Sequence, residues 1–251
     1  NIINKDANNF FFMSSKIRLY FSNKIQSELI THLTKDQSHY VKDVMRLKVG
    51  DLLSIFNDQG EWNAKIENYE KNKANIKILE KVRNMKNENN IWLAFSPIRQ
   101  NPLNFMIQKT TELGIQKFIP IICERSMVKD VNIERIKKII IESSEQSNRI
   151  SIPNITKKES LINFLNLFPK KGRIIFCDIN CKKSNLKNIL SKKIEGPTCV
   201  LIGPEGDFSE NERQSIIDLN QTFSISLASN ILRAETAAIA AVTLVNFQLN
   251  L

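Results

Sequence analysis

Short apolar strands alternate with helical segments from Ile91 onward, and this rhythm constrains the fold more than any other feature of the chain. The predicted strands are 91–95, 117–122, 173–177, 198–202 and 222–227, with helices at 101–113 and 133–146. Strands that alternate with helices form a mostly parallel sheet covered on both faces. We therefore expect an α/β domain over residues 91–251, with ligands bound beyond the carboxyl ends of its strands.

The N-terminal third of the chain follows a different pattern. Strands are expected at 18–21, 51–56, 62–67 and 74–80, with one helical stretch over 35–46. Short strands with a single helix suggest a small β-barrel, which we place at residues 14–84. The polar run 84–90 carries almost nothing to bury and is predicted to be a linker. Residues 1–13 are expected to form a disordered extension.

Composition narrows the class of protein. The 251 residues carry a net charge of +10, which favours a polyanionic partner such as nucleic acid, although abundant Lys, Asn and Ile can also reflect an AT-rich genome. No apolar run is long enough to span a membrane. The 4 cysteines are scattered and there are only 2 histidines, so we expect no metal site and reduced thiols in a cytoplasmic protein.

The first segment that suggests chemistry runs from Val200 to Glu212. A buried strand leads into Gly203-Pro204-Glu205-Gly206, where glycines let the backbone approach a ligand closely. Ser209 and Glu212 have the spacing of a capping box and predict the start of a helix. The segment is a candidate ligand-binding loop, and a plain strand-to-helix connection is the alternative. It matches neither the dinucleotide fingerprint nor the P-loop pattern.

The second segment runs from Leu227 to Val242. A strand ends, a short loop follows, and a helix is predicted to begin near Arg233. Glu235 and Thr236 fall in its first turn, where the helix dipole favours acidic groups. The alanine-rich continuation allows another element to pack closely. An ordinary core helix is the alternative.

Together the two segments resemble the RsmE family of 16S ribosomal RNA uridine-N3 methyltransferases, in the SPOUT superfamily. The resemblance rests on Leu201–Ser209 and Leu227–Ala237, and it extends over residues 14–250 in the family's order and spacing. Further matching segments are 18–21, 39–51, 107–114, 124–126 and 142–149. Two residues depart from the pattern: Asp207 stands where the family usually has glycine, and Ala228 where glycine is frequent.

The resemblance implies a fold that periodicity alone does not suggest. Family members have an N-terminal PUA-like β-barrel followed by a SPOUT-type parallel sheet whose C-terminal part forms a trefoil knot. They act as homodimers, and the alanine-rich helix from Ala234 would contribute to the dimer contact. The knot holds S-adenosylmethionine. Carried over to this chain, the cofactor-binding residues would be Leu201, Ile202, Gly203, Gly206, Leu227, Ile231, Leu232, Thr236 and Ala237.

The resemblance also implies the reaction, which is methyl transfer from S-adenosylmethionine to N3 of a uridine in 16S ribosomal RNA of the small subunit. Arg233 would stabilise negative charge that develops on the base, and either Glu205 or Glu235 would take the N3 proton or orient Arg233. The expected RNA contacts are Arg18, His39, Arg46, Lys48, Arg125 and Arg149.

Two other functions fit the same residues. One is a SPOUT methyltransferase that modifies another position in ribosomal or transfer RNA, including a ribose hydroxyl. The other is a ribosome-assembly factor that has kept the fold without activity, although the retained Gly203, Arg233 and Glu235 argue against it. A nicotinamide oxidoreductase fits poorly because the dinucleotide fingerprint is missing.

Overall fold

The computed structural model of the protein describes residues 17–181 and 185–250, which form two compact units. Unit 1 contains the described residues up to Lys86 together with Glu145–Ser151. Unit 2 contains Asn87–Ser144 and the described residues from Ile152 onward. The expected extension, residues 1–13, lies outside the described part.

Unit 1 is built on a five-stranded sheet with the order β1-β3-β4-β5-β2. β1 (Arg18–Tyr20) pairs in parallel with β3 (Leu52–Asn57), and the other neighbouring strands are antiparallel. β4 (Gly60–Glu70) and β5 (Lys73–Arg83) form a long hairpin bordered by β2 (Ile30–His32). The short, largely exposed β2 gave no alternation in the sequence and was not predicted. Within residues 17–86, β1 and β2 do not pair, so the described pairing leaves the sheet open.

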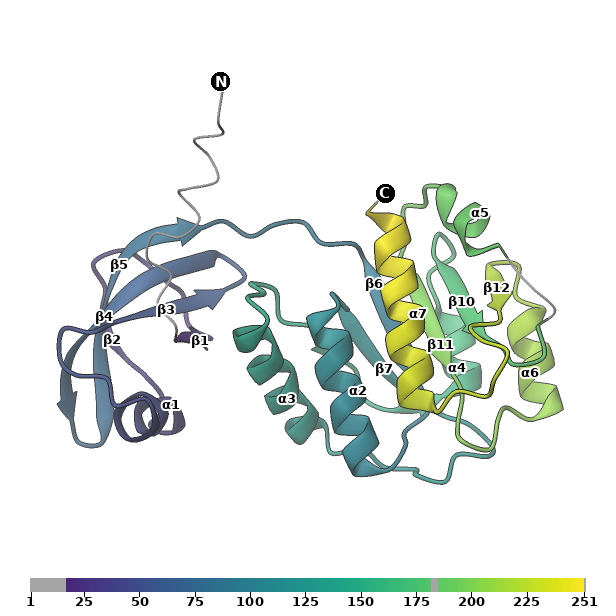
Figure 1. The fold of residues 1–251 in the computed structure, drawn as a ribbon, viewed down its shortest axis with the longest axis horizontal. Helices are drawn as coiled ribbons and strands as arrows, with labels where there is room; N and C mark the ends of the chain where they lie inside the picture. Colours follow the sequence, from purple (N-terminus) through teal and green to yellow (C-terminus); the bar gives the residue numbers. More distant parts are fainter. Residues whose placement is uncertain (1–16, 182–184, 251) are drawn as a thin grey trace, which may run out of the picture. The chain divides into compact units, whose positions relative to one another are not determined.

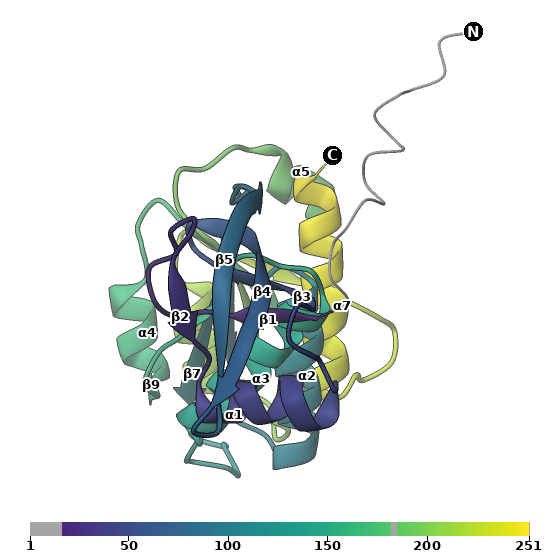
Figure 2. The same cartoon turned by 90° about the vertical axis from the view of Figure 1, so that its left-hand side faces the viewer.

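The helical stretch predicted over 35–46 is present in two pieces. α1 (Lys35–His39) begins with a capping box between Thr34 and Gln37 and continues as a π-helix, η2 (Tyr40–Val44). Arg46 then adopts a left-handed φ of 56°, which ends the helical backbone. Figure 2 shows α1 across one end of the strands of unit 1. The linker that follows the sheet has no helix or strand between 84 and 90, as predicted.

Unit 2 contains the predicted parallel sheet. Its strands are in the order β12-β10-β11-β6-β7-β8, and β9 pairs separately with β7. Every described pairing is parallel. The strands are β6 (Ile91–Phe95), β7 (Lys117–Ile122), β8 (Asn154–Ile155), β9 (Glu159–Ser160), β10 (Arg173–Cys177), β11 (Thr198–Ile202) and β12 (Thr222–Ile225). All five predicted strands are present. The two-residue β8 and β9 are too short to have left a periodic signal.

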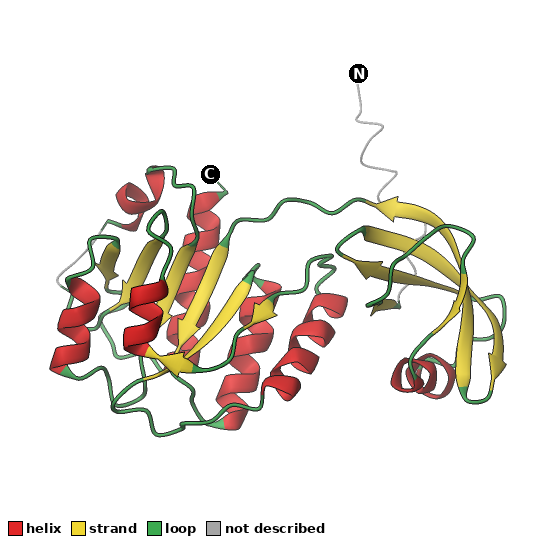
Figure 3. Ribbon diagram, turned by 180° about the vertical axis from the view of Figure 1, so that it is seen from behind, coloured by secondary structure: helices red, strands yellow, loops and turns green. Residues whose placement is uncertain are grey.

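Helices cover both faces of this sheet, as Figures 1 and 3 show from opposite sides. The helices are α2 (Gln100–Glu112), α3 (Ile133–Gln146), α4 (Leu161–Leu167), α5 (Leu186–Ser191), α6 (Glu210–Ile217) and α7 (Ala234–Leu249). One apolar core joins the sheet to α2, α3 and α7, and a second joins the opposite face to α4 and α6. Successive side chains of β11 point into different cores: Val200 belongs to the first and Leu201 to the second. Of the described helices, none is long and apolar enough to cross a bilayer.

Candidate functional site

Three loops meet at one edge of the unit 2 sheet because their strands are neighbours and run in parallel. β12, β10 and β11 are adjacent, so the residues after Cys177, Ile202 and Ile225 leave the sheet at the same end. This is the edge at which open α/β sheets bind ligands. The two segments singled out in the sequence, 203–209 and 226–233, therefore lie beside a third loop that begins at Asp178.

Gly203 is required by close packing in the loop after β11. A Cβ atom at this position would lie 2.5 Å from the Phe208 ring, well inside van der Waals contact. Phe208 is buried and packs edge-on against Phe176, with ring centroids 5.4 Å apart. The tight loop thus depends on a glycine that touches the core rather than on one with an unusual backbone conformation.

Asp207 explains one departure from the family pattern. Its φ of 60° lies in the left-handed region, where glycine is the least strained residue and aspartate is one of the tolerated alternatives. The Asp207 carboxylate accepts a hydrogen bond from the Phe208 N–H at 2.8 Å. The substitution therefore keeps the loop conformation. Ala228, the other departure, does not have a positive φ.

The first turn of α6 ties the neighbouring loops together. Ser209 and Glu212 form the predicted capping box. The Glu212 carboxylate also accepts a hydrogen bond from the Glu124 N–H at 2.7 Å, in the loop after β7. The Arg125 guanidinium donates to the carbonyls of Gly206 and Phe208, each at 3.3 Å.

A buried ion pair fixes the third loop. Asp178, whose side chain is only 3% exposed, accepts from Arg213 of α6 at 2.8 Å and from the Asn180 N–H at 2.9 Å. The hydrogen bond that Arg213 donates to the Asp178 carboxylate raises the pKa of the guanidinium, so this side chain stays charged. Arg213 thereby joins the loop after β10 to the helix that follows β11.

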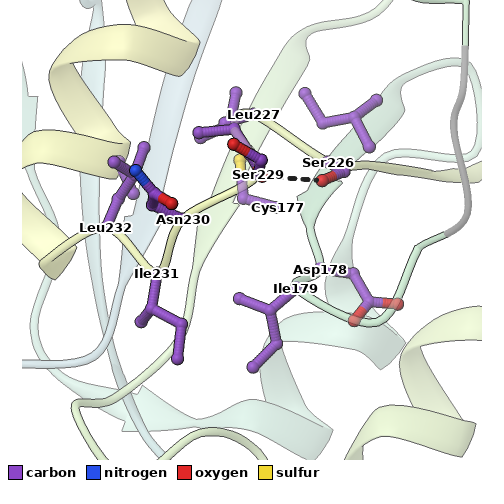
Figure 4. Close-up of a pocket in the computed structure, with 12 residues that line it drawn as sticks. Cys177, Asp178, Ile179, Ser226, Leu227, Ser229, Asn230, Ile231 and Leu232 are labelled. Atoms are coloured by element: carbon purple, nitrogen blue, oxygen red, sulfur yellow. Dashed lines mark hydrogen bonds between the residues drawn. The ribbon is translucent and has the colours of Figure 1, made fainter.

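The loops after β10 and β12, together with the start of α7, line an open pocket. Its lining residues are Cys177, Asp178, Ile179, Ile225, Ser226, Leu227, Ala228, Ser229, Asn230, Ile231, Leu232 and Ala237. Figure 4 shows the side chains of Ile179 and Ile231 pointing toward each other, while the Asp178 carboxylate points away. Both isoleucines are largely exposed, at 57% and 84%. The pocket thus offers apolar walls to a ligand.

The pocket also offers main-chain donors. The N–H groups of Ser229, Asn230, Ile231 and Leu232 make no hydrogen bond with the described part of the chain. Ser226 Oγ donates to the Ala228 carbonyl at 3.3 Å and braces the start of this loop. Apolar walls with a few free main-chain polar groups are typical of sites that bind a small molecule or a cofactor.

Only some of the cofactor-binding residues expected from the resemblance line the pocket. Four line the pocket: Leu227, Ile231, Leu232 and Ala237. The side chains of Leu201 and Ile202 are buried in the two cores. Gly203, Gly206 and Thr236 lie outside the lining. Sequence reasoning missed Asp178 and Ile179, because only the order of the strands reveals that the loop after β10 borders the pocket.

The three residues expected in catalysis lie in two of these loops and the helix that follows. Arg233 is the N-cap residue of α7, with an exposed side chain. Glu205 is exposed in the loop after β11, and Glu235 is half-buried in the first turn of α7. Within the described part of the chain, none of the three side chains forms an ion pair, so each is available to a ligand.

One thiol lines the pocket, that of Cys177. Burial raises its pKa to about 12, which favours the protonated form at neutral pH. Burial likewise raises the pKa values of Cys123 and Cys199 to about 12. All four cysteines are free thiols.

The six expected RNA contacts lie in different environments. His39, Arg46 and Lys48 are exposed in unit 1, and His39 is bonded to Asp43 at 2.7 Å. Arg125 is exposed but holds the loop carbonyls described above.

Arg18 and Arg149 differ from these four: the Arg18 side chain is only 8% exposed, and Arg149 is buried. Arg18 bonds Glu61 at 2.9 Å and the Arg149 carbonyl at 2.9 Å, and Arg149 donates to Ser151 at 2.7 Å. This environment does not favour a role for them as direct phosphate contacts, because each guanidinium is engaged inside unit 1.

Comparison with known proteins gives consistent matches. The RNA methyltransferase domain family matches residues 85–246, and the RNA methyltransferase PUA domain family matches residues 33–79. Ribosomal RNA small subunit methyltransferase E of Rickettsia conorii is 36% identical over 228 residues, which covers 90% of this chain and 93% of that protein. The protein of the same name from Buchnera aphidicola subsp. Schizaphis graminum is 32% identical over 237 residues, covering 90% and 94%.

Solved structures agree with this result. The crystal structure of ribosomal RNA small subunit methyltransferase E from Neisseria gonorrhoeae, bound to S-adenosyl methionine, superimposes with a TM-score of 0.82 at 26% identity. The match covers 91% of this chain and 95% of that one. A Legionella pneumophila structure with bound SAM superimposes with a TM-score of 0.80, also at 26% identity, and covers 91% and 96%.

Proposed function

The chain belongs to the RsmE family of ribosomal RNA methyltransferases, and from this premise we propose that it transfers a methyl group from S-adenosylmethionine to N3 of a uridine in 16S ribosomal RNA. The observation that carries the proposal is the pocket at the carboxyl edge of the sheet, lined by the second of the family's two segments, 227–237, and by the loop after β10. A relative of known name matches nearly the whole chain, which supports the same activity.

The pocket residues fit S-adenosylmethionine. Ile179, Leu227 and Ile231 supply apolar walls for the adenine, and the free N–H groups of 229–232 supply donors. When bound, the cofactor supplies a methyl group on a positively charged sulfur, which is already a strong electrophile. The protein's main task is therefore to hold the base in line and to manage the N3 proton.

Arg233 is proposed to stabilise the negative charge that develops on a uracil oxygen as N3 loses its proton. Its exposed guanidinium at the start of α7, without an ion-pair partner in the described residues, supports this role. Glu205 and Glu235 remain alternatives for the group that accepts the proton or orients Arg233.

The RNA surface is proposed to include His39, Arg46, Lys48 and Arg125, which are exposed. Arg18 and Arg149 are assigned instead to holding unit 1 together, because both guanidiniums are buried. The proposed domains are a PUA-like barrel at 14–84 and a knotted SPOUT domain at 91–251. The closed barrel and the trefoil knot are proposed from the resemblance to the family, and the position of the loop 226–233 beside the loop after β10 supports the proposal of a knot.

A homodimer is proposed through the outer face of α7. Ala238, Ala241, Val242 and Val245 face the core, whereas Leu244 and Phe247 are 45% and 65% exposed. Large apolar side chains on the outer face of an alanine-rich helix favour close contact with a second copy. Leu244→Glu should shift sedimentation toward the monomer.

The substrate, the small ribosomal subunit, implies action in the cytoplasm.

Binding and transfer are tested together. Calorimetry should detect S-adenosylmethionine binding by the wild-type protein and by Arg233→Ala, whereas label transfer to small subunits from cells lacking the modification should be lost in Arg233→Ala. Arg135→Ala, which removes an exposed arginine of α3 outside the pocket lining, is the matched control and should retain transfer. Binding of S-adenosylmethionine without methyl transfer to any RNA would contradict the proposed activity and favour an assembly factor. Absence of both would contradict the cofactor site itself.

A further inference from the structure

Unit 1 carries a hollow of its own, distant in sequence from the cofactor loops. It lies between α1 and η2 on one side and the turn that joins β4 to β5 on the other. Its lining residues are Lys35, Ser38, His39, Lys42, Asp43, Tyr69, Lys71 and Asn72. Of these, only His39 belongs to the RNA surface proposed above.

The charge of the hollow is positive. Three lysines, Lys35, Lys42 and Lys71, line it against a single acid, Asp43. Asp43 is already engaged by His39 at 2.7 Å. Across residues 17–181 and 185–250, no ion pair involves any of the three lysines. Three ammonium groups around one hollow repel each other, and an anion bound between them would relieve that repulsion.

The framework beneath these lysines is fixed. Ser38 is buried, donates to the Leu33 carbonyl and accepts from the Ala74 N–H at 2.9 Å, which ties α1 to β5. The Tyr69 hydroxyl donates to the Leu47 carbonyl at 2.8 Å, and Lys42 Nζ lies 5.5 Å from the centre of the Tyr69 ring. The hollow is therefore bounded by side chains whose positions are set before any ligand arrives.

The backbone on both sides of the hollow is unusual. Lys42 and Asp43 belong to the π-helix η2, a rare conformation that is frequent at functional sites. Lys71 and Asn72 have φ values of 47° and 62°. Glycine makes such a turn with the least strain, so a lysine at this position adds a cation to the hollow at a conformational cost.

We propose that this hollow binds a backbone phosphate of the RNA substrate through Lys35, Lys42 and Lys71. The inference rests on the proposed function for the identity of the RNA. Lysine ammoniums are compact charges that bind phosphate without reading sequence, so the site would position the RNA rather than select a base. It would give unit 1 an RNA contact of its own, in addition to the pocket of unit 2.

The test uses the full chain and a 16S ribosomal RNA transcript as the probe. RNA binding is measured over a series of salt concentrations for Lys35→Gln/Lys42→Gln/Lys71→Gln. The matched control, Lys24→Gln/Lys138→Gln/Lys187→Gln, removes the same charge from exposed lysines outside the hollow. Calorimetry with S-adenosylmethionine checks that unit 2 is intact in both variants.

The expected result is a Kd for RNA raised at least about tenfold at 0.1 M salt in the hollow variant. The slope of log Kd against log salt concentration should also decrease by about 1 for each phosphate that the variant no longer neutralises. The control variant should change the Kd by less than about threefold. Lys35→Arg/Lys42→Arg/Lys71→Arg should restore binding, because phosphate recognition needs the charge.

Equal RNA affinity in the hollow and control variants would overturn the proposal. Inorganic phosphate that binds in the hollow without any change in RNA binding would also overturn it. If the wild-type protein binds RNA but transfers no methyl group, the proposed function fails while the hollow is still judged by RNA affinity alone.

Discussion

Gly203→Ala should destabilise the protein through one identified contact. The added Cβ would lie 2.5 and 2.9 Å from two atoms of the Phe208 ring, so the ring must move by about 1 Å to restore ordinary contact. Phe208 is 4% exposed and packs on Phe176, which leaves it little room. Overpacking of this kind costs about 1–3 kcal/mol. For a chain of this size, about 2 kcal/mol corresponds to a decrease in Tm of roughly 4–8 °C.

Gly206→Ala is the matched control in the same loop. Its Cβ would meet no atom closer than 3.5 Å, and its φ is not positive, so stability should be unchanged or slightly higher. Differential scanning calorimetry without cofactor measures both variants. A Gly203→Ala variant as stable as the wild type, or a Gly206→Ala variant that loses as much stability, would refute the packing argument.

Three carboxylates provide further tests. Burial alone would raise the pKa of Glu61, but Arg18 and Arg83 outweigh it and hold the pKa below its ordinary value of 4.5. This stabilisation is present above about pH 4.5 and is lost as the pH falls through the lower folded-state pKa. Glu61→Gln should therefore lower the free energy of unfolding by about 3 kcal/mol at pH 7. In denaturation experiments at a series of pH values, the variant should also lose less stability than the wild type as the pH is lowered. Asp178→Asn should raise the Kd for S-adenosylmethionine about tenfold in calorimetry by releasing the loop from Arg213. Asp218→Asn, at the C-cap of α6, should leave the Kd unchanged, and equal Kd values for the two variants would contradict the positioning role of Asp178. Asp207→Ala should lower the free energy of unfolding in urea by about 1 kcal/mol, because alanine keeps the left-handed strain and lacks the hydrogen bond to the Phe208 N–H. Asp207→Gly should lower it by less, and the reverse order would contradict this account.

The sequence predicted the fold wherever local chemistry decides it. The apolar stretches became β6, β7, β10, β11 and β12, and the Ser209–Glu212 spacing became a capping box. β2, β8 and β9 were not predicted, because two or three residues carry no period. The π-helical turn after His39 was predicted as ordinary helix, since both share the same local propensity.

The two segments of the site were predictable from the sequence, but the residues that meet them in the folded chain were not. Leu227, Ile231 and Ala237 were expected near the cofactor and line the pocket. Asp178 and Ile179 were missed because β10 is a neighbour of β11 and β12 only in the folded sheet. Arg18 and Arg149 were expected at the surface, since burial of an arginine depends on distant carbonyls and carboxylates that no single sequence specifies.

The most direct test of the central claim is the identity of the methylated nucleoside. Small ribosomal subunits from cells lacking the modification are incubated with the protein and labelled S-adenosylmethionine, and the digested RNA is analysed by mass spectrometry. The account predicts 3-methyluridine, absent with Arg233→Ala. Label in a different nucleoside, such as a ribose-methylated one, would contradict the assignment of the reaction to N3 of uridine.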